Sequence, residues 1–284
     1  MQGAIPQPNR ILIADDEDSI RELLSRALTE KGYAVETAKD GAEALERVER
    51  QQYSLVLLDI WMPRVNGLEV LSKLHARSSP PRVIVMTADN TPETLLHAVK
   101  EEAYQCMAKP FSLHSMTDLV DRVLSSSSQA PAIEVISAQP QWIQLLVPCE
   151  RETVERIESF LMSIRTEMPE KMRHEVGQAF HELLINAIEW GGKLDPNRRV
   201  YIGCIRTRRM ILYRISDPGH GFRLEGLDHA AINNPNDNVL RHIEIREQKG
   251  LRPGGFGLLL TRALVDELIY NEARNEVVFL KYLD

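Results

Sequence analysis

Residues 55–59 read LVLLD, an unbroken apolar run that ends in a carboxylate. An apolar run without polar alternation is typical of a strand whose two faces are both covered. Residues 83–86, VIVM, repeat this pattern, and residues 11–13, ILI, form a shorter version just before two aspartates. Strands of this kind indicate a parallel sheet with helices on both faces.

The surrounding residues, 10–124, alternate between strand-like and helix-like stretches. Two weaker strands are expected at residues 33–37 and 105–108. Apolar residues recur at helical spacing between residues 20 and 28, and further helices are expected at residues 41–50 and 113–124. The alternation predicts a doubly wound α/β domain.

The rest of the chain predicts a second domain at residues 132–284, after a short linker at residues 125–131, SSSSQAP. Small polar residues followed by proline favour flexible or extended backbone. Residues 1–9 lack an apolar core, so they are expected to be a disordered N-terminus and not a signal peptide.

The second domain is expected to be α+β, with helices on one face of a mixed sheet. Its predicted strands are residues 142–147, 199–205, 210–216 and 277–283, and its predicted helices are residues 150–165, 170–190 and 257–268. Residues 223–252 are polar with little periodicity, and so long an irregular stretch is typically functional, often a lid.

Composition narrows the class of protein. The 284 residues carry a formal net charge of −7, which argues against a general nucleic-acid binder. No apolar run approaches the roughly 20 residues of a membrane helix. The three cysteines have no paired or metal-like spacing. We therefore expect a cytoplasmic protein that binds neither nucleic acid nor membrane.

Five polar residues follow the predicted strands of the first domain: Asp15, Asp16, Asp59, Thr87 and Lys109. The carboxyl ends of parallel strands converge on one crevice. Clustered carboxylates repel one another unless a cation joins them, and Mg²⁺ suits an all-oxygen site. Asp59 could then attack phosphorus while Lys109 and Thr87 hold the transferred oxygens. An aspartate pair alone is most often a solvated turn or a helix cap; the ordered set favours phosphoryl transfer.

These residues make residues 10–124 resemble the flavodoxin-like receiver domain of bacterial response regulators. The matching motifs are Asp15-Asp16-Glu17, Leu58–Pro63 (LDIWMP), Asn66-Gly67, Thr87-Ala88 and Lys109-Pro110-Phe111. The resemblance implies that a sensor histidine kinase phosphorylates Asp59. It also implies Mg²⁺ held by the three aspartates and by the main-chain carbonyl of Trp61.

One position departs from this family. The family has an aromatic residue three positions before the lysine, which rotates inward when the switch threonine engages the phosphoryl group. Here that position is Cys106, and Tyr104 lies two residues earlier, on the same strand face if the strand is regular. Cys106 is expected to be a small buried hydrophobe.

The second domain contains a polar helix face. Glu182, Asn186 and Trp190 recur every fourth residue. Glu182 could act as a general base and Asn186 could offer an oxygen to Mg²⁺ on a nucleotide. A glutamate and an asparagine four apart are otherwise most often an exposed pair. Trp190 is expected to pack in the core, with packing against the lid or a stacking surface as the alternatives.

Two glycine-rich segments complete a predicted ATP pocket. Asp217 ends a strand and could accept a hydrogen bond from adenine, and Gly219 and Gly221 permit close backbone approach. Gly255 and Gly257 precede a helix whose free N–H groups can meet phosphate. Each segment alone is a common turn; their order beside the helix favours a nucleotide site.

Residues 140–284 resemble the ATPase domain of histidine kinases, and most closely its anti-sigma-factor serine-kinase branch. The matching motifs are residues 182–191 (ELLINAIEWG), 217–222 (DPGHGF), 255–258 (GFGL) and 264–268 (LVDEL). The resemblance implies an ATP-dependent serine/threonine kinase acting on a sigma factor or an antagonist protein.

Two alternatives to this output stay open. The domain could be a non-catalytic module that binds a partner when ATP sets its lid, or it could phosphorylate histidine on another protein. His174 and His181 are expected to be ordinary helix residues, because that family carries its phosphorylated histidine on a separate dimerising hairpin. The effect of Asp59 phosphorylation, activating or inhibiting, and the formation of a homodimer are also left open.

Overall fold

The computed structural model describes residues 9–89, 91–125, 133–139, 141–163, 168–223, 230–231, 234, 238, 240–249 and 255–283. The chain forms two compact units, residues 1–130 and 131–284. The expected N-terminal disorder at residues 1–9 and the expected linker at residues 125–131 lie almost wholly outside the described residues, as does much of the expected lid.

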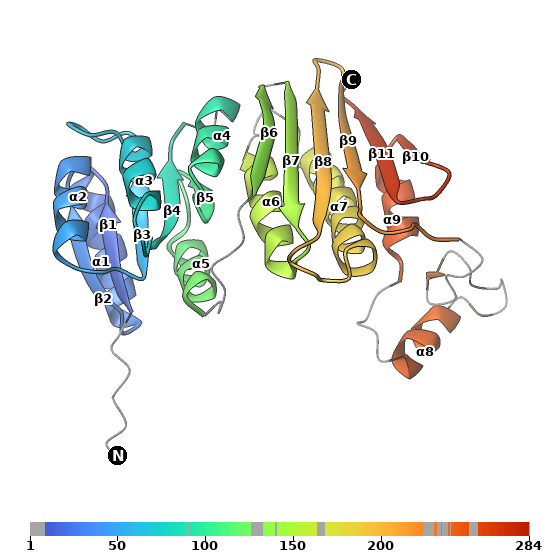
Figure 1. Cartoon of the computed structure of the whole chain (residues 1–284), viewed down its shortest axis with the longest axis horizontal. Helices are drawn as coiled ribbons and strands as arrows, with labels where there is room; N and C mark the ends of the chain where they lie inside the picture. The colour runs from blue at the N-terminus through green and yellow to red at the C-terminus, as the bar shows by residue number, and fades with distance from the viewer. Residues whose placement is uncertain are drawn as a thin grey trace. The chain divides into compact units, whose positions relative to one another are not determined.

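The first unit is a doubly wound α/β domain, as predicted (Figure 1). Its five strands are parallel, in the order β2-β1-β3-β4-β5. The strands are β1 Arg10–Ala14, β2 Ala34–Ala38, β3 Leu55–Asp59, β4 Arg82–Thr87 and β5 Gln105–Ala108. The helices are α1 Asp18–Glu30, α2 Gly41–Arg50, α3 Gly67–His75, α4 Pro92–Lys100 and α5 Leu113–Ser125.

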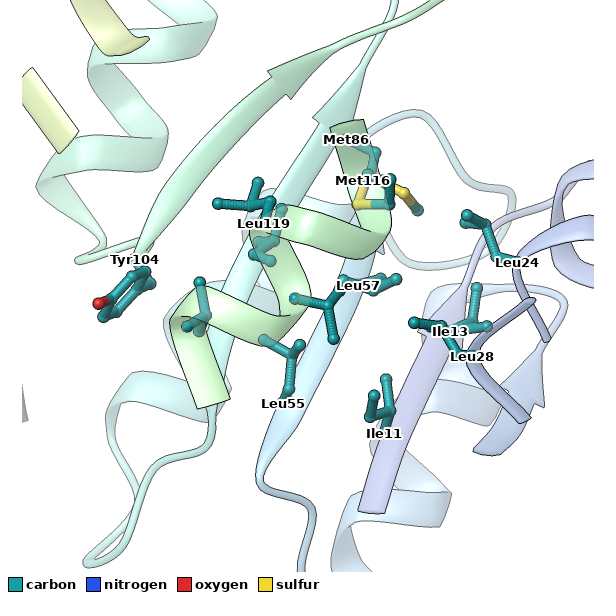
Figure 2. Packing of buried hydrophobic residues seen from close by; sticks show 13 residues of the cluster. Ile11, Ile13, Leu24, Leu28, Leu55, Leu57, Met86, Tyr104, Met116 and Leu119 are labelled. Carbon is teal, nitrogen blue, oxygen red and sulfur yellow. The ribbon is translucent and has the colours of Figure 1, made fainter. Parts of the chain in front are cut away.

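The apolar strand runs form the core of this unit. Every residue of β3 is buried, which explains why residues 55–59 show no polar alternation. Figure 2 shows one side of this core, where α1 contributes Leu24 and Leu28, and α5 contributes Met116 and Leu119. Burying one such side chain contributes about 1.5–3 kcal/mol.

The second unit is α+β, with a six-stranded sheet in the order β10-β11-β9-β8-β7-β6. The strands are β6 Glu134–Gln139, β7 Trp142–Pro148, β8 Arg199–Arg206, β9 Met210–Ser216, β10 Glu267–Tyr270 and β11 Glu276–Tyr282. The helices are α6 Arg151–Ser163, α7 Glu170–Asn186, α8 Arg241–Gln248 and α9 Gly257–Leu264, with a π-helical segment at Ala187–Gly191. Buried and half-exposed residues alternate along β9 and β11, as in a sheet covered on one face.

All strand pairs described in this sheet are antiparallel, so the expectation of a mixed sheet is wrong. The reason lies in the connection between β7 and β8. A single crossover helix would produce a parallel pair, whereas here two helices, α6 and α7, intervene. The chain therefore returns to the end of the sheet that it left, and Pro148 pairs with Arg199.

Within the parts of the chain that the structure describes, no helix is both long enough and apolar enough to cross a membrane.

Candidate functional sites

The predicted acidic cluster forms at the carboxyl ends of β1, β3 and β5. Asp15 follows β1 and is fully buried, and Asp59 is the last residue of β3. Nζ of Lys109, just after β5, lies 2.8 Å from Oδ2 of Asp15 and 2.9 Å from Oδ1 of Asp59. Strands that are distant in sequence thus bring two carboxylates onto one ammonium group.

Local backbone contacts hold these carboxylates in place. Oδ1 of Asp15 accepts a hydrogen bond from the main-chain N–H of Glu17 at 3.0 Å. Gly67, at the start of α3, packs directly against the end of β3, where an added Cβ would lie 2.0 Å from the Asp59 carbonyl oxygen. Only glycine fits this close approach, which accounts for the Asn66-Gly67 motif.

The electrostatics of the cluster are unbalanced. Burial raises the pKa of Asp59, and the charges of Asp15 and Asp16 add to this, against the opposing effect of Lys109. Burial alone would lower the pKa of Lys109, but its two carboxylate partners outweigh it and raise the pKa. The cluster thus concentrates negative charge around one half-buried ammonium group.

The donor set fits Mg²⁺, a hard cation that prefers oxygen ligands. Oδ2 of Asp15 is shielded from solvent, and among the described residues its close polar neighbour is Nζ of Lys109, at 2.8 Å. Asp16 is exposed at the rim, where a hydrated ion could reach it. The side chain of Trp61 points to solvent, with 56% of its surface exposed, which is compatible with the family's use of its carbonyl alone.

Thr87 ends β4 at the same edge of the sheet and is fully buried. Its hydroxyl accepts a hydrogen bond from the Asp89 N–H at 3.0 Å and has no recorded contact with Asp59. Its main-chain carbonyl accepts a hydrogen bond from the N–H of Lys109 at 2.8 Å. Thr87 is therefore next to the cluster, with its hydroxyl engaged in its own loop.

Cys106 is buried, with 4% of its surface exposed, as expected for a small hydrophobe. It pairs with Val85, whereas Tyr104 belongs to the cluster that packs on α5, as Figure 2 shows. A shared strand face was expected only for a regular strand, and Tyr104 lies in a bend before β5, so that condition is not met. The guanidinium of Arg82 lies 5.5 Å from its ring centre.

A cavity of about 310 Å³ opens in the second unit. It is lined by all seven residues expected to hold the nucleotide: Glu182, Asn186, Asp217, Gly219, Gly221, Gly255 and Gly257. These residues come from α7, from the loop after β9 and from the start of α9. The structure thus brings the three separate segments together around one cavity.

α7 and α9 approach closely at this cavity. A Cβ at Gly257 would lie 2.3 Å from Oε2 of Glu182, so glycine permits the contact. Glu182 makes no ion pair or hydrogen bond with the residues described here, which leaves its carboxylate free toward the cavity. Trp190 is 46% exposed at the cavity rim, so the expectation of core packing is wrong. Trp190 belongs to the π-helical segment that follows α7, and it lines the cavity together with Glu182 and Asn186.

Asp217 is fixed beside glycines. Its Oδ1 accepts a hydrogen bond from the N–H of Gly219 at 2.7 Å, and a Cβ at Gly191 would lie 2.2 Å from the carboxylate. Burial raises its pKa, against the opposing effects of the Gly219 N–H and the charge of Arg198. Gly221 adopts a φ of 76°, and Gly255 one of 100°, both in the region that favours glycine.

Several lining residues had no signal in the sequence. Ile215, Val277 and Tyr270 come from three strands, and Arg246 comes from α8. They carry no motif and reach the cavity only through the pairing of the sheet. His181 contacts Glu158 of α6 at 2.8 Å, which agrees with its expected place as an ordinary helix residue.

Two family models match the chain: the response regulator receiver domain over residues 11–121, and the histidine kinase-like ATPase domain over residues 147–281. Regulatory protein AtoC of Escherichia coli is 34% identical over 142 residues, which cover 49% of this chain and 31% of AtoC. Response regulator MprA of Mycobacterium leprae is 34% identical over 128 residues, covering 45% of this chain and 56% of MprA. The chemotaxis response regulator CheY4 of Vibrio cholerae has 29% identity and a TM-score of 0.39, covering 41% of this chain and 98% of CheY4.

The chain therefore contains a response regulator receiver domain and a histidine kinase-like ATPase domain. This is the domain pair of a two-component response regulator with an ATPase domain as its second half. The chain spans 31% of the length of AtoC and 56% of the length of MprA.

Proposed function

We propose that phosphorylation of Asp59 controls an ATP-dependent protein serine/threonine kinase in the second half of the chain. The target would be a sigma factor or an antagonist protein that carries an acceptor Ser or Thr. A sensor histidine kinase would donate the phosphoryl group to Asp59. The observation that carries the proposal is the gathering of all three nucleotide motifs around one cavity, in a chain that also has the acidic cluster.

At the acidic cluster, a carboxylate oxygen of Asp59 attacks phosphorus, the phosphorus–nitrogen bond of the donor histidine breaks, and an acyl phosphate forms. Lys109, which already contacts Asp59, would then neutralise the phosphoryl oxygens. Asp15, Asp16, Asp59 and the carbonyl of Trp61 would hold Mg²⁺, which supplies charge neutralisation when bound. The hydroxyl of Thr87 would exchange its bond to Asp89 for one to the phosphoryl group.

In the second cavity, Asp217 would accept a hydrogen bond from the amino group of adenine. Asn186 would offer its side-chain oxygen to Mg²⁺ on the phosphates. The N–H groups at Gly255 and Gly257 would meet the phosphates, because these residues lie at the N-terminus of α9, which begins at Gly257. Glu182, whose carboxylate has no partner among the described residues, would accept the proton of the attacking hydroxyl.

The test uses the full chain with radiolabelled Mg-ATP and the sigma factors and antagonist proteins encoded in the same genome. We expect acid-stable phosphate on Ser or Thr of one of them, and none with Glu182→Ala, which should still bind Mg-ATP. Phosphate that is lost in acid and stable in base would assign histidine transfer instead. Nucleotide binding without transfer to any of these proteins would leave an ATP-gated binding module.

A further inference from the structure

Three strands present one row of side chains to the nucleotide cavity. Ile215 of β9 pairs with Val277 of β11, and Val277 pairs with Tyr270 of β10. Cross-strand neighbours point to the same face of a sheet, and all three side chains line the cavity. Because adjacent strands lie about 4.8 Å apart, the row extends over about 10 Å. The cavity floor is thus apolar at two positions and carries a hydroxyl at the third.

Within the described residues, the hydroxyl of Tyr270 has no hydrogen-bond partner. Its oxygen is shielded from solvent and makes no hydrogen bond within the described ranges. Burial raises the pKa of Tyr270 to about 12, so the hydroxyl stays neutral. The ring is held edge-to-face against Phe222, with centroids 5.9 Å apart and planes at 82°. A buried hydroxyl without a hydrogen bond is costly, so a partner is expected from whatever fills the cavity.

Asp217 lies at the opposite end of this floor. It comes directly after β9, two residues after Ile215, and both side chains line the cavity. Its carboxylate is packed by Gly191 and Gly219 on one side and faces the cavity on the other. A flat bicyclic base lying on Ile215 and Val277 would therefore meet a carboxylate at one edge and a hydroxyl at the other. A tyrosine hydroxyl can donate or accept, so it suits the ring nitrogens of a purine.

We propose that the hydroxyl of Tyr270 hydrogen-bonds the purine base of the bound nucleotide and contributes to the choice of base. This inference rests on the proposed function, because it takes the cavity to be a nucleotide site. It assigns a role to a residue of an edge strand that none of the three nucleotide motifs contains.

The test is Tyr270→Phe in the full chain, which removes one oxygen and keeps the ring against Phe222. Calorimetry with Mg-ATP and with Mg-ADP should show both dissociation constants raised about tenfold, which is about 1.4 kcal/mol. The melting temperature of the unliganded protein should rise by about 2–4 °C, because an unpaired buried hydroxyl is removed. If Tyr270 had only a structural role, Tyr270→Phe would lower the melting temperature. Weaker nucleotide binding together with a higher melting temperature therefore identifies a hydroxyl that serves the ligand.

Tyr282→Phe is the matched control, since Tyr282 is exposed, lies outside the cavity and bonds Glu267. It should leave both dissociation constants unchanged. If the wild type binds Mg-ATP and Tyr270→Phe binds it equally well, the inference is overturned and the proposed function stands. A weakening confined to Mg-ATP would place the hydroxyl at the phosphates and also overturn it. Absence of nucleotide binding by the wild type would overturn the proposed function itself.

Discussion

At the residue scale, Lys109 and Glu182 stand in opposite situations. Lys109 is held between the carboxylates of Asp15 and Asp59 before any phosphoryl group arrives. Glu182 lies against Gly257 and has no charged partner within the described part of the chain. The ammonium group of Lys109 is therefore already in position to stabilise negative charge that is added to Asp59. The carboxylate of Glu182 is suited to accepting a proton.

The first prediction concerns the phosphoryl acceptor. Asp59→Asn keeps the size and shape of the side chain and removes the nucleophilic oxygen. With acetyl phosphate and Mg²⁺, the wild type should gain one phosphate in the receiver domain, and the variant should gain none, as measured by intact-protein mass spectrometry. Asp89→Asn is the control, because the Asp89 carboxylate accepts hydrogen bonds from Thr91 and Thr94 at the start of α4 and has no bond to Asp59 among the described contacts. Equal labelling of Asp59→Asn would refute the assignment.

The second prediction separates binding from transfer in the ATPase domain. Asn186→Ala removes the proposed oxygen ligand of Mg²⁺, so the dissociation constant of Mg-ATP should rise about 10–100-fold, or 1.5–3 kcal/mol. Glu182→Ala should bind Mg-ATP normally and lose transfer by about 10²–10⁴-fold. Calorimetry and phosphate transfer measure the two effects. A Glu182→Ala variant that transfers at the wild-type rate would remove this residue from the chemistry.

At the scale of elements, the sequence predicted those parts of the fold that depend on local pattern. The five strands of the receiver sheet and the helices around residues 41–50 and 113–124 follow from apolar runs and helical periodicity. β6 and β10 were not predicted, because both are edge strands defined by pairing with a single neighbour. The helix expected at residues 257–268 ends at Leu264, because the residues from Glu267 onward form β10 and pair with β11. The three nucleotide motifs were found because glycine and carboxylate positions are local, whereas Tyr270 reaches the cavity only through sheet pairing.

The third prediction compares two glycines that line the cavity from different parts of the fold, Gly221 in the loop after β9 and Gly257 at the start of α9. At Gly221, φ is 76° and an added Cβ would lie 1.6 Å from the Ala273 carbonyl oxygen. Backbone atoms cannot easily give way, so Gly221→Ala should destabilise the second unit by roughly 1–3 kcal/mol in urea unfolding. At Gly257, the obstructing atom is the end of the flexible Glu182 side chain. Gly257→Ala should leave stability nearly unchanged and reduce transfer. Equal stability of both variants would contradict this geometry.

The fourth prediction concerns α5 and its anchor to the start of β2. Asp121 of α5 forms an ion pair with Lys31 and accepts a hydrogen bond from Tyr33 at 2.7 Å. Burial would raise the pKa of Asp121, but these two contacts outweigh it and lower the pKa below 3.8. The anchor therefore adds stability above pH 3.8 that is lost as the pH falls through the pKa of the folded state.

Asp121→Asn should lower the urea midpoint at pH 7 by an amount equivalent to about 1 kcal/mol, because one partly exposed pair is lost. The difference from the wild type should shrink as the pH falls toward 3. Asp118→Asn, one turn earlier on α5, is the matched control, since its recorded partner is the exposed His114 on the same helix. A difference between wild type and Asp121→Asn that stays constant with pH would show that the anchor is not ionic.

At the scale of the whole molecule, the acidic cluster and the nucleotide cavity lie in different compact units, residues 1–130 and 131–284. Phosphorylation of Asp59 can change the output only if it stabilises one arrangement of the chain more than another. Cys106 stands where the receiver family has its aromatic switch, so we expect movement of Thr87 to pass through the β5–α5 segment. The main-chain bond between Lys109 and Thr87 offers such a route.

The last prediction tests this coupling. Beryllofluoride with Mg²⁺ serves as a phosphoryl mimic on Asp59, and Mg-ATP affinity and transfer rate are measured with and without it. We expect a change of about 5–150-fold in one of them, which corresponds to 1–3 kcal/mol of coupling. Cys106→Tyr, which restores the family's aromatic residue, should alter the size of this change, and Asp59→Asn should abolish it. Lengthening the serine-rich segment at residues 125–131 should weaken the coupling if the chain connection carries it. If the mimic and the longer segment both leave output unchanged, the two domains are merely tethered, and phosphorylation of Asp59 does not control the ATPase domain.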